Sequence, residues 1–152
     1  MLIPLFLGCV TVFVSMVIQV WVVVVMVRYI LKILDRKNRE KDSIKFETLV
    51  ISEVLLILFF GHLLQIAIWA QLFMTLGEFD HFMTSFYHSA VNFASLGYGD
   101  IVMSEQWRLL GAIEASNGVL MFGLSAGAML SVMNAIFSHH WKPNQAISDK
   151  DD

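Results

Sequence analysis

The sequence predicts an all-α membrane protein with three transmembrane helices, one re-entrant short helix and a glycine-rich loop that follows it. Of the 152 residues, 57% are hydrophobic and 15% are charged. The hydrophobic residues form long runs in segments 1–34, 48–76 and 107–138, and a helix of about 20 apolar residues is enough to cross a bilayer. A soluble domain of this size would need a very large oligomeric interface to cover so much apolar surface.

Segment 1–34 is the first predicted transmembrane helix. No charged residue precedes Arg28, and Lys32 follows one turn later, where long side chains can extend to the membrane interface. The valine run at 22–25 has strand propensity, but backbone in lipid must satisfy its own hydrogen bonds, which favours a helix. The segment lacks the regularly spaced arginines of a voltage sensor.

Segment 35–47 is the charged loop between the first two spans. Seven of the ten Lys and Arg residues of the chain lie between Arg28 and Lys45. Because positively charged loops stay on the cytoplasmic side, this loop is expected in the cytoplasm. The N-terminus is then outside, and the C-terminus, with the polar tail 139–152, is cytoplasmic.

Segment 48–76 is the second span and contains three polar residues. Glu53 is expected near the cytoplasmic interface, within reach of a Lys or Arg. It lies about half a helical turn out of phase with His62, which argues against a shared metal. His62 and Gln65 share a helix face; a hydrogen bond to a neighbouring helix is the preferred interpretation, and a pH-responsive contact is the alternative.

Segment 81–93 is apolar and aromatic but too short to span, which favours a re-entrant or buried helix. It leads into Ala94–Asp100 (ASLGYGD), where two glycines flank one aromatic residue. Glycine tolerates positive φ, so the carbonyls of this loop can all point the same way. Non-helical backbone at membrane depth is tolerated where it is buried in protein or lines water. The loop therefore indicates a pore.

Segment 107–138 is the third span. Its small residues recur at spacings that approximate one helix face and allow close helix approach in lipid; they are Gly111, Ala115, Gly118, Gly123 and Gly127. The chain has no nucleotide-binding loop, catalytic triad, zinc-ligand spacing or nucleic-acid surface. We therefore predict no enzyme, no cofactor and no nucleic-acid partner.

The Gly97-Tyr98-Gly99-Asp100 motif, placed between a short aromatic helix and a long inner helix, resembles the selectivity filter of the potassium channel superfamily. Residues 48–138 resemble the complete pore module of that superfamily, and the first span is an addition. The chain is similar to small prokaryotic two-transmembrane-type ion channels. The resemblance implies a homotetramer in the cytoplasmic membrane, in contact with lipid and with K⁺ bound in the filter.

The resemblance also assigns roles to individual residues. Filter carbonyls would coordinate K⁺, the filter mouth would follow them, and the inner helix would supply a hinge and cavity lining. These residues are Ser95, Leu96, Gly97 and Tyr98 for coordination, Gly99 and Asp100 for the mouth, Gly118 for the hinge, and Phe122 and Gly123 for the cavity.

Three further residues are candidates for filter support: His88, Asn92 and Glu114. His88 stands where relatives often have an aromatic residue that supports the filter tyrosine, and it would either donate that hydrogen bond or make the filter pH-sensitive. Glu114 lies near filter depth, where a lone carboxylate is unfavourable. It is expected to bond to Asn92 or Ser89 of the short helix; the alternative is that its charge attracts cations.

The sequence thus predicts a passive cation channel, most consistent with potassium selectivity. Ser95-Leu96 replaces the usual Thr-Val, and serine lacks the methyl group that helps fix the threonine rotamer. A channel weakly selective between Na⁺ and K⁺ is therefore an alternative. A non-conducting membrane subunit that regulates a partner is a second alternative, from another functional class.

Overall fold

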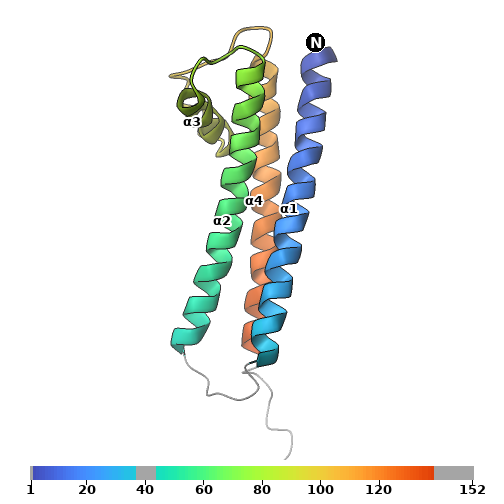
Figure 1. Cartoon of the computed structure of the whole chain (residues 1–152), viewed down its shortest axis with the longest axis vertical. Helices are drawn as coiled ribbons and strands as arrows, with labels where there is room; N and C mark the ends of the chain where they lie inside the picture. The colour runs from blue at the N-terminus through green and yellow to red at the C-terminus, as the bar shows by residue number, and fades with distance from the viewer. Residues whose placement is uncertain (1, 37–43, 139–152) are drawn as a thin grey trace, which may run out of the picture.

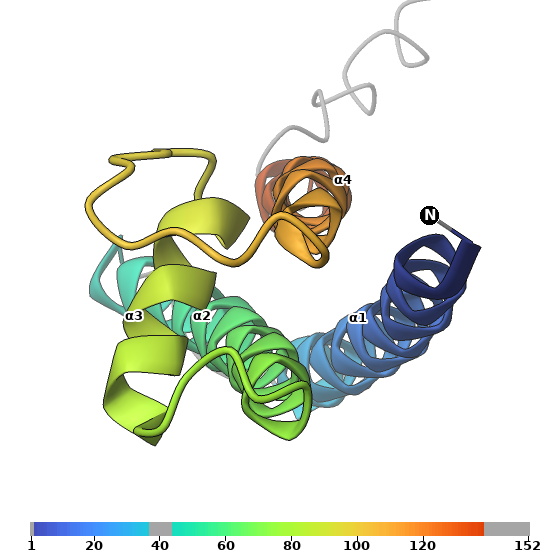
Figure 2. The same cartoon turned by 90° about the horizontal axis from the view of Figure 1, so that it is seen from above.

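The computed structural model describes residues 2–36 and 44–138, and all the secondary structure in these residues is helical. The four helices are α1 (Leu2–Arg36), α2 (Ile44–Thr75), α3 (Phe82–Phe93) and α4 (Arg108–Ser138). The three long helices lie side by side, and α3 packs beside one end of α2 and α4 (Figures 1 and 2). Most of the predicted charged loop and the predicted tail 139–152 lie outside the described residues.

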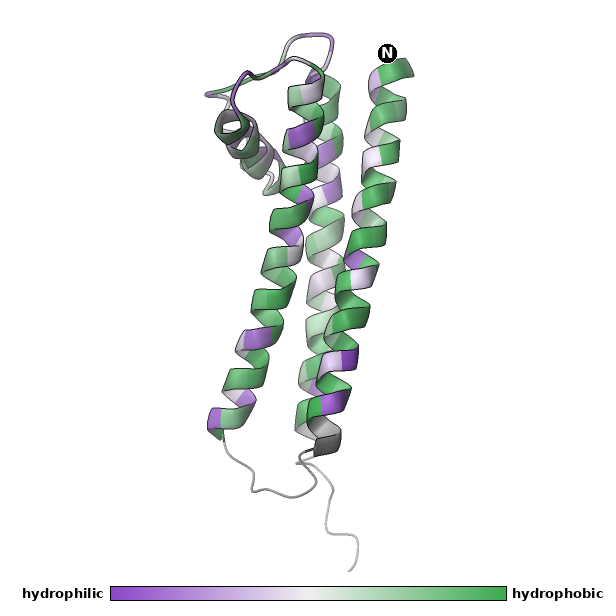
Figure 3. Ribbon diagram, viewed as in Figure 1, coloured by the Kyte–Doolittle hydropathy of each residue, from purple (hydrophilic) through white to green (hydrophobic). Residues whose placement is uncertain are grey.

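The three long helices are the three predicted spans. Each is long and apolar enough to cross a membrane, over Leu2–Ile33, Ile44–Thr75 and Arg108–Ile136. Hydrophobic residues occupy most positions along the three long helices, with polar positions interspersed (Figure 3). The helix α2 begins at Ile44, before the predicted start at residue 48, because no helix-breaking residue lies between Ile44 and Thr48.

Two glycines let the long helices approach closely. A Cβ placed on Gly8 of α1 would lie 2.7 Å from the Cδ1 atom of Ile113 in α4. A Cβ on Gly61 of α2 would lie 3.1 Å from the Val22 side chain of α1. Small residues bring helix backbones together and increase van der Waals contact in lipid. The added helix α1 is therefore closely packed against both α2 and α4.

The core divides into two parts along the bundle. The α3-side half is centred on large side chains: Ile66, Trp69, Phe73, Phe93, Met103, Leu110 and Met121. The buried residues of the far half are aliphatic apart from one thioether: Val22, Met26, Ile30, Val50, Val54, Leu58, Val132 and Ile136. The candidate site lies in the α3-side half.

The loops at the α3 end are tied together. Gly77 ends α2 with a φ of 76°, a conformation that glycine adopts readily. Beyond it, the Glu78 carboxylate accepts hydrogen bonds from the Ser104 backbone N–H at 2.7 Å and the Ser104 hydroxyl at 2.6 Å. This contact joins the loop after α2 to the loop before α4.

Candidate functional site

The glycine loop after α3 has an alternating backbone conformation. Ser95, Gly97 and Gly99 have φ values of 57°, 58° and 72°, whereas Leu96 and Tyr98, between them, do not have positive φ. In an extended strand successive carbonyls point to opposite sides. Reversing the sign of φ at every second residue turns successive carbonyls towards one side, so the loop can present a row of oxygens.

Ser95 also ends α3. The Ser95 N–H donates to the Asn92 carbonyl at 2.7 Å, and the Leu96 N–H donates to the Val91 carbonyl at 2.9 Å. This pair of bonds is the Schellman motif, in which the residue after the helix cap adopts the left-handed conformation. Glycine usually fills that position, and a serine there is strained by about 1 kcal/mol. Nothing in the sequence pattern signals this conformation, because serine rarely adopts positive φ.

The side chains of the loop are uncovered in the single chain. Leu96 is 54% exposed and Tyr98 is 65% exposed. A Cβ added to Gly97 or Gly99 would meet no atom within 4 Å. Large apolar side chains that project from such a loop need a covering surface, and the described part of this chain does not supply one.

A hydrogen bond between Tyr87 and Asp100 holds the C-terminal end of the loop. The Tyr87 hydroxyl donates to Asp100 Oδ2 at 2.7 Å, and the Ile101 N–H donates to Asp100 Oδ1 at 3.1 Å. The bond to this carboxylate raises the pKa of Tyr87 above its usual value. Sequence reasoning missed Tyr87, because only the fold brings α3 next to the end of the loop.

His88 contacts the backbone of Ile101, the residue after Asp100. Its Nδ1 lies 3.0 Å from the Ile101 carbonyl oxygen, and its Nε2 lies 2.9 Å from Asn92 Nδ2. A neutral ring that donates from Nδ1 and accepts at Nε2 satisfies both contacts. In the described chain His88 therefore bonds to Ile101 rather than to the predicted partner Tyr98.

The environment of His88 favours that neutral form. Its ring packs on Phe73 and Phe79, with ring centroids 5.6 and 5.0 Å away. Burial lowers the pKa of His88, and this effect outweighs the opposing effects of the Ile101 carbonyl and the Asp100 and Glu78 carboxylates.

Glu114 is fully buried and contacts α3 through Ser89. Ser89 Oγ bonds to Glu114 Oε1 and lies 2.9 Å from the Ile66 carbonyl of α2. Ser89 has one hydroxyl hydrogen, which an ionised Glu114 and the carbonyl would both accept. Both contacts of the Ser89 hydroxyl can be hydrogen bonds at once when the Glu114 carboxyl donates to Ser89 and Ser89 donates to the Ile66 carbonyl. The contact with Ser89 is one of the two that the sequence predicted for Glu114.

Two glycines of α4 make room for the end of α3. A Cβ on Gly118 would lie 1.9 Å from the Phe93 carbonyl oxygen, and a Cβ on Gly111 would lie 3.0 Å from Asn92 Nδ2. In the structure, α4 continues as one helix through Gly118. Close approach of two backbones is thus a sufficient reason for glycine at 118, and its role as a hinge stays a prediction.

A polar network links the three long helices just below α3. Gln65 Nε2 donates to Gln19 Oε1 at 2.8 Å, and Gln19 Nε2 donates to Ser125 Oγ at 2.8 Å. Ser125 Oγ in turn lies 3.0 Å from His62 Nε2. His62 and Gln65 thus hydrogen-bond to neighbouring helices, which is the interpretation that the sequence favours. The sequence did not predict a role for Gln19, because a single amide in an apolar run gives no indication of which residue it bonds to.

Phe122 links this network to α3. Its ring stands edge-on to His62, with centroids 4.8 Å apart, and lies 5.6 Å from the Phe93 ring. Phe122 is still 42% exposed, and a Cβ added to Gly123, the next residue, would meet no atom within 4 Å. Both residues therefore keep an open side, as cavity-lining residues would.

Metal-ligating side chains do not converge in the described residues. Within 2–36 and 44–138, no three His, Cys, Asp or Glu residues are placed to hold one metal ion. Glu53 bonds to Tyr29 and His62 bonds to Ser125, so these two side chains have separate partners.

The fold and the loop define a multi-pass membrane protein whose short helix carries a carbonyl-rich loop. The profile of a protein family described as "Ion channel" matches residues 50–135, more than half of the chain. The protein belongs to this ion channel family, and the matched segment is a pore module of the potassium channel superfamily type. Searches of curated proteins and of solved structures each found no match.

Proposed function

We propose that this chain is one subunit of a homotetrameric, potassium-selective channel that conducts ions passively. The observation that carries the proposal is the alternation of φ at Ser95, Gly97 and Gly99. It lets the carbonyls of residues 95–98 line one side of the loop, where they replace the hydration shell of a dehydrated cation. Asp100, held by Tyr87, would add negative charge at the outer mouth.

Exposure in the single chain supports assembly around a common axis. One loop supplies one wall of a pore, and four copies would enclose an ion. Leu96 and Tyr98 are then covered by neighbouring subunits. The charged loop on the other side of the membrane would be cytoplasmic.

Ser95 is the reason to keep weak Na⁺/K⁺ selectivity as a second candidate. It is strained, and its hydroxyl makes only a long contact of 3.5 Å with the Ala115 carbonyl. Selectivity depends on how firmly the size and the oxygen number of each site are held. A poorly held serine would loosen the innermost site.

Ion flux and oligomer mass test the proposal together. Purified protein in detergent is expected to have the mass of four chains, and vesicles containing it are expected to pass K⁺ with a reversal potential that follows the K⁺ gradient. A potential midway between those of Na⁺ and K⁺ would favour weak selectivity. A monomer, or no flux at any voltage or pH, would favour a non-conducting subunit.

Two glycine variants connect the flux to the loop. Gly97→Ala places a side chain at positive φ in the candidate filter and is expected to abolish K⁺ flux. Gly77→Ala is the matched control, because Gly77 also has positive φ and open space around it but lies outside the loop. If both variants lose flux equally, backbone strain rather than ion coordination explains the loss.

A further inference from the structure

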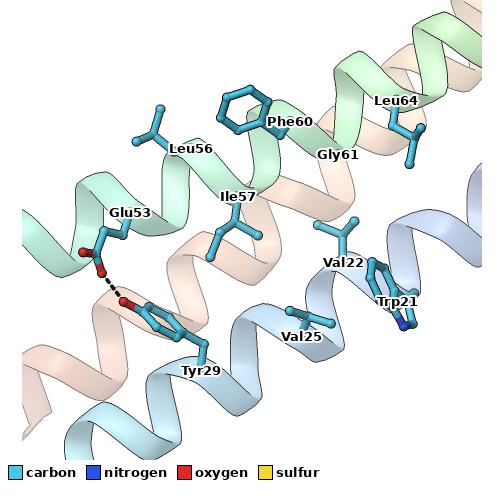
Figure 4. A pocket seen from close by; sticks show the side chains of 10 residues that line it. All are labelled: Trp21, Val22, Val25, Tyr29, Glu53, Leu56, Ile57, Phe60, Gly61 and Leu64. Carbon is cyan, nitrogen blue, oxygen red and sulfur yellow. Dashed lines mark hydrogen bonds between the residues drawn. The ribbon is translucent and has the colours of Figure 1, made fainter.

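A groove lies between α1 and α2, and none of its lining residues belongs to the candidate pore. Its cavity volume is about 580 Å³. Figure 4 shows the side chains that line it. Tyr29 and Glu53 lie at one end of the groove, and Trp21 and Leu64 lie at the other. Between them the wall is apolar, with Val25 among its residues.

The polar end of the groove has an unbalanced negative charge. The Tyr29 hydroxyl donates a hydrogen bond to Glu53 Oε2. Within the described residues, no Lys or Arg forms an ion pair with the Glu53 carboxylate. A carboxylate on an apolar, lipid-facing wall is unfavourable without a cation. This end of the groove is therefore complementary to a positively charged group.

The length of the groove matches one leaflet of a bilayer. Along α1, Tyr29 lies about 12 Å from Trp21, and Lys32 lies about 16 Å from it. Half of the hydrocarbon core measures about 15 Å. Lys32 follows Tyr29 by three residues and so lies on the same side of the helix, exposed. With Lys32 at headgroup level, Trp21 lies near the bilayer centre, well away from the interface where tryptophan is enriched.

We propose that this groove binds a phospholipid whose headgroup carries a primary ammonium. The ammonium donates a hydrogen bond to the Glu53 carboxylate beside Tyr29. One acyl chain follows the apolar wall past Val25 towards Trp21. The site goes beyond the proposed channel function, since it lies outside the pore and requires only that α1 and α2 sit in a membrane.

The headgroup chemistry distinguishes this lipid from others. A choline headgroup has the same charge but no N–H group, so it cannot donate a hydrogen bond to Glu53. A glycerol headgroup has no positive charge to pair with the carboxylate. A second copy of this chain on the same surface would have to bring its own cation to Glu53, and it would exclude added lipid from the groove.

Quenching of Trp21 tests the proposal directly. The full chain is placed in choline-lipid vesicles, and lipids with brominated acyl chains and either an ethanolamine or a choline headgroup are added in equal amounts. Trp21 is 65% exposed, and the signal of a Trp21→Phe variant is subtracted to remove the other tryptophans. We expect the ethanolamine lipid to reach half-maximal quenching at about threefold lower mole fraction, the size of one exposed charge-assisted contact.

Two substitutions assign the preference to the polar end. Glu53→Gln is expected to abolish the preference, while Glu105→Gln, which changes an exposed carboxylate in the loop before α4, is expected to keep it. Equal quenching by both lipids in the unmodified chain would overturn the proposal. This comparison does not depend on whether any variant folds. Absence of quenching by either lipid would also overturn it, because another copy would then cover the groove. None of these outcomes depends on ion flux.

Discussion

The two halves of the bundle are held together by different interactions. In the α3-side half every long helix contributes buried polar side chains, among them Gln19, His62 and Glu114, and these bond across helices. In the far half the buried residues of the core are aliphatic or methionine. Hydrogen bonds are directional and fix helix register, whereas aliphatic contacts tolerate sliding. We therefore expect the α3-side half to be rigid and any movement of α4 to be easiest in the far half.

The largest expected effect comes from closing the space between α3 and α4. Gly118→Ala would place a methyl group 1.9 Å from the Phe93 carbonyl oxygen, and backbone atoms cannot yield as a flexible side chain does. We expect a loss of about 3 kcal/mol or more in stability and loss of K⁺ flux. Thermal unfolding in detergent and flux from vesicles measure the two effects.

Gly127→Ala is the matched control in α4. Its Cβ would meet no atom within 4 Å in the single chain, and alanine favours a helix over glycine by about 1 kcal/mol. This variant is therefore expected to be at least as stable as the unmodified chain. Equal damage from both substitutions would mean that the helix simply rejects larger residues, and that the contact with Phe93 is not special.

The second effect tests the hydrogen bonds below α3. Ser89→Ala removes the hydroxyl that joins Glu114 to the Ile66 carbonyl, leaving the buried Glu114 Oε1 atom without this partner, while the Ile66 carbonyl keeps its bond within α2. We expect a loss of about 1–3 kcal/mol, measured by thermal unfolding. Glu114→Gln keeps a donor for Ser89 and is expected to retain most of this stability.

The same pair of variants separates bracing from cation attraction. If Glu114 acts as a brace, Glu114→Gln keeps the single-channel conductance while Ser89→Ala lowers the stability. A marked drop in conductance for Glu114→Gln, with unchanged unfolding temperature, would instead assign Glu114 to cation attraction.

The sequence predicted the fold well because the membrane leaves few choices for an apolar segment. Lipid requires backbone hydrogen bonds to be satisfied internally, so the long apolar runs had to be helices. The half-length segment 81–93 could not span, and the glycines after it had to form the loop. Glu114 had to find a partner because it is a carboxylate at membrane depth.

The details that sequence reasoning missed depend on contacts between distant residues. Ser95 adopts positive φ because α3 ends there in a Schellman motif, although serine itself does not favour that conformation. Tyr87 reaches Asp100 only because the loop returns past α3. Gln19 sits in an otherwise apolar run, and its role follows from Gln65 and Ser125 on two other helices.

A third prediction uses pH to test the C-terminal end of the loop, where His88 bonds to Ile101. Because burial lowers the pKa of His88 in the folded chain, the unfolded chain binds the proton more readily. The stability from neutral His88 is fully present above the unfolded pKa of about 6.5 and is lost as the pH falls from there through the folded pKa. We expect K⁺ flux to fall with acidification over that window.

The control for the pH effect is His88→Asn, which removes the titration while keeping a donor for the Ile101 carbonyl. This variant is expected to show a flatter flux profile between neutral pH and pH about 5 than the unmodified chain. The carboxylates of Glu78 and Asp100, which also face His88, remain in both proteins. An unchanged profile in His88→Asn would assign the pH response to another group.

The smallest expected effect tests whether the polar network or the aliphatic packing holds α1 in register. Gln19→Leu has a similar volume and removes both bonds that Gln19 makes to Gln65 and Ser125. Hydrogen bonds between membrane helices contribute about 0.6 kcal/mol each on average, so we expect a loss of about 1 kcal/mol. Met26→Leu, at a fully buried position of the far half, conserves volume and is expected to change stability less.

Stability alone does not measure register, so a cross-linking experiment completes the test. Cysteines at Gly8 and Ile113, which face each other across α1 and α4, report whether the helices keep their alignment in a background where Cys9 is serine. In that background Gln19→Leu is expected to slow disulfide formation at this pair, and Met26→Leu is expected to leave it unchanged. Equal rates in both variants would show that packing alone fixes the register of α1. The contrast between the two halves would then concern composition and not rigidity.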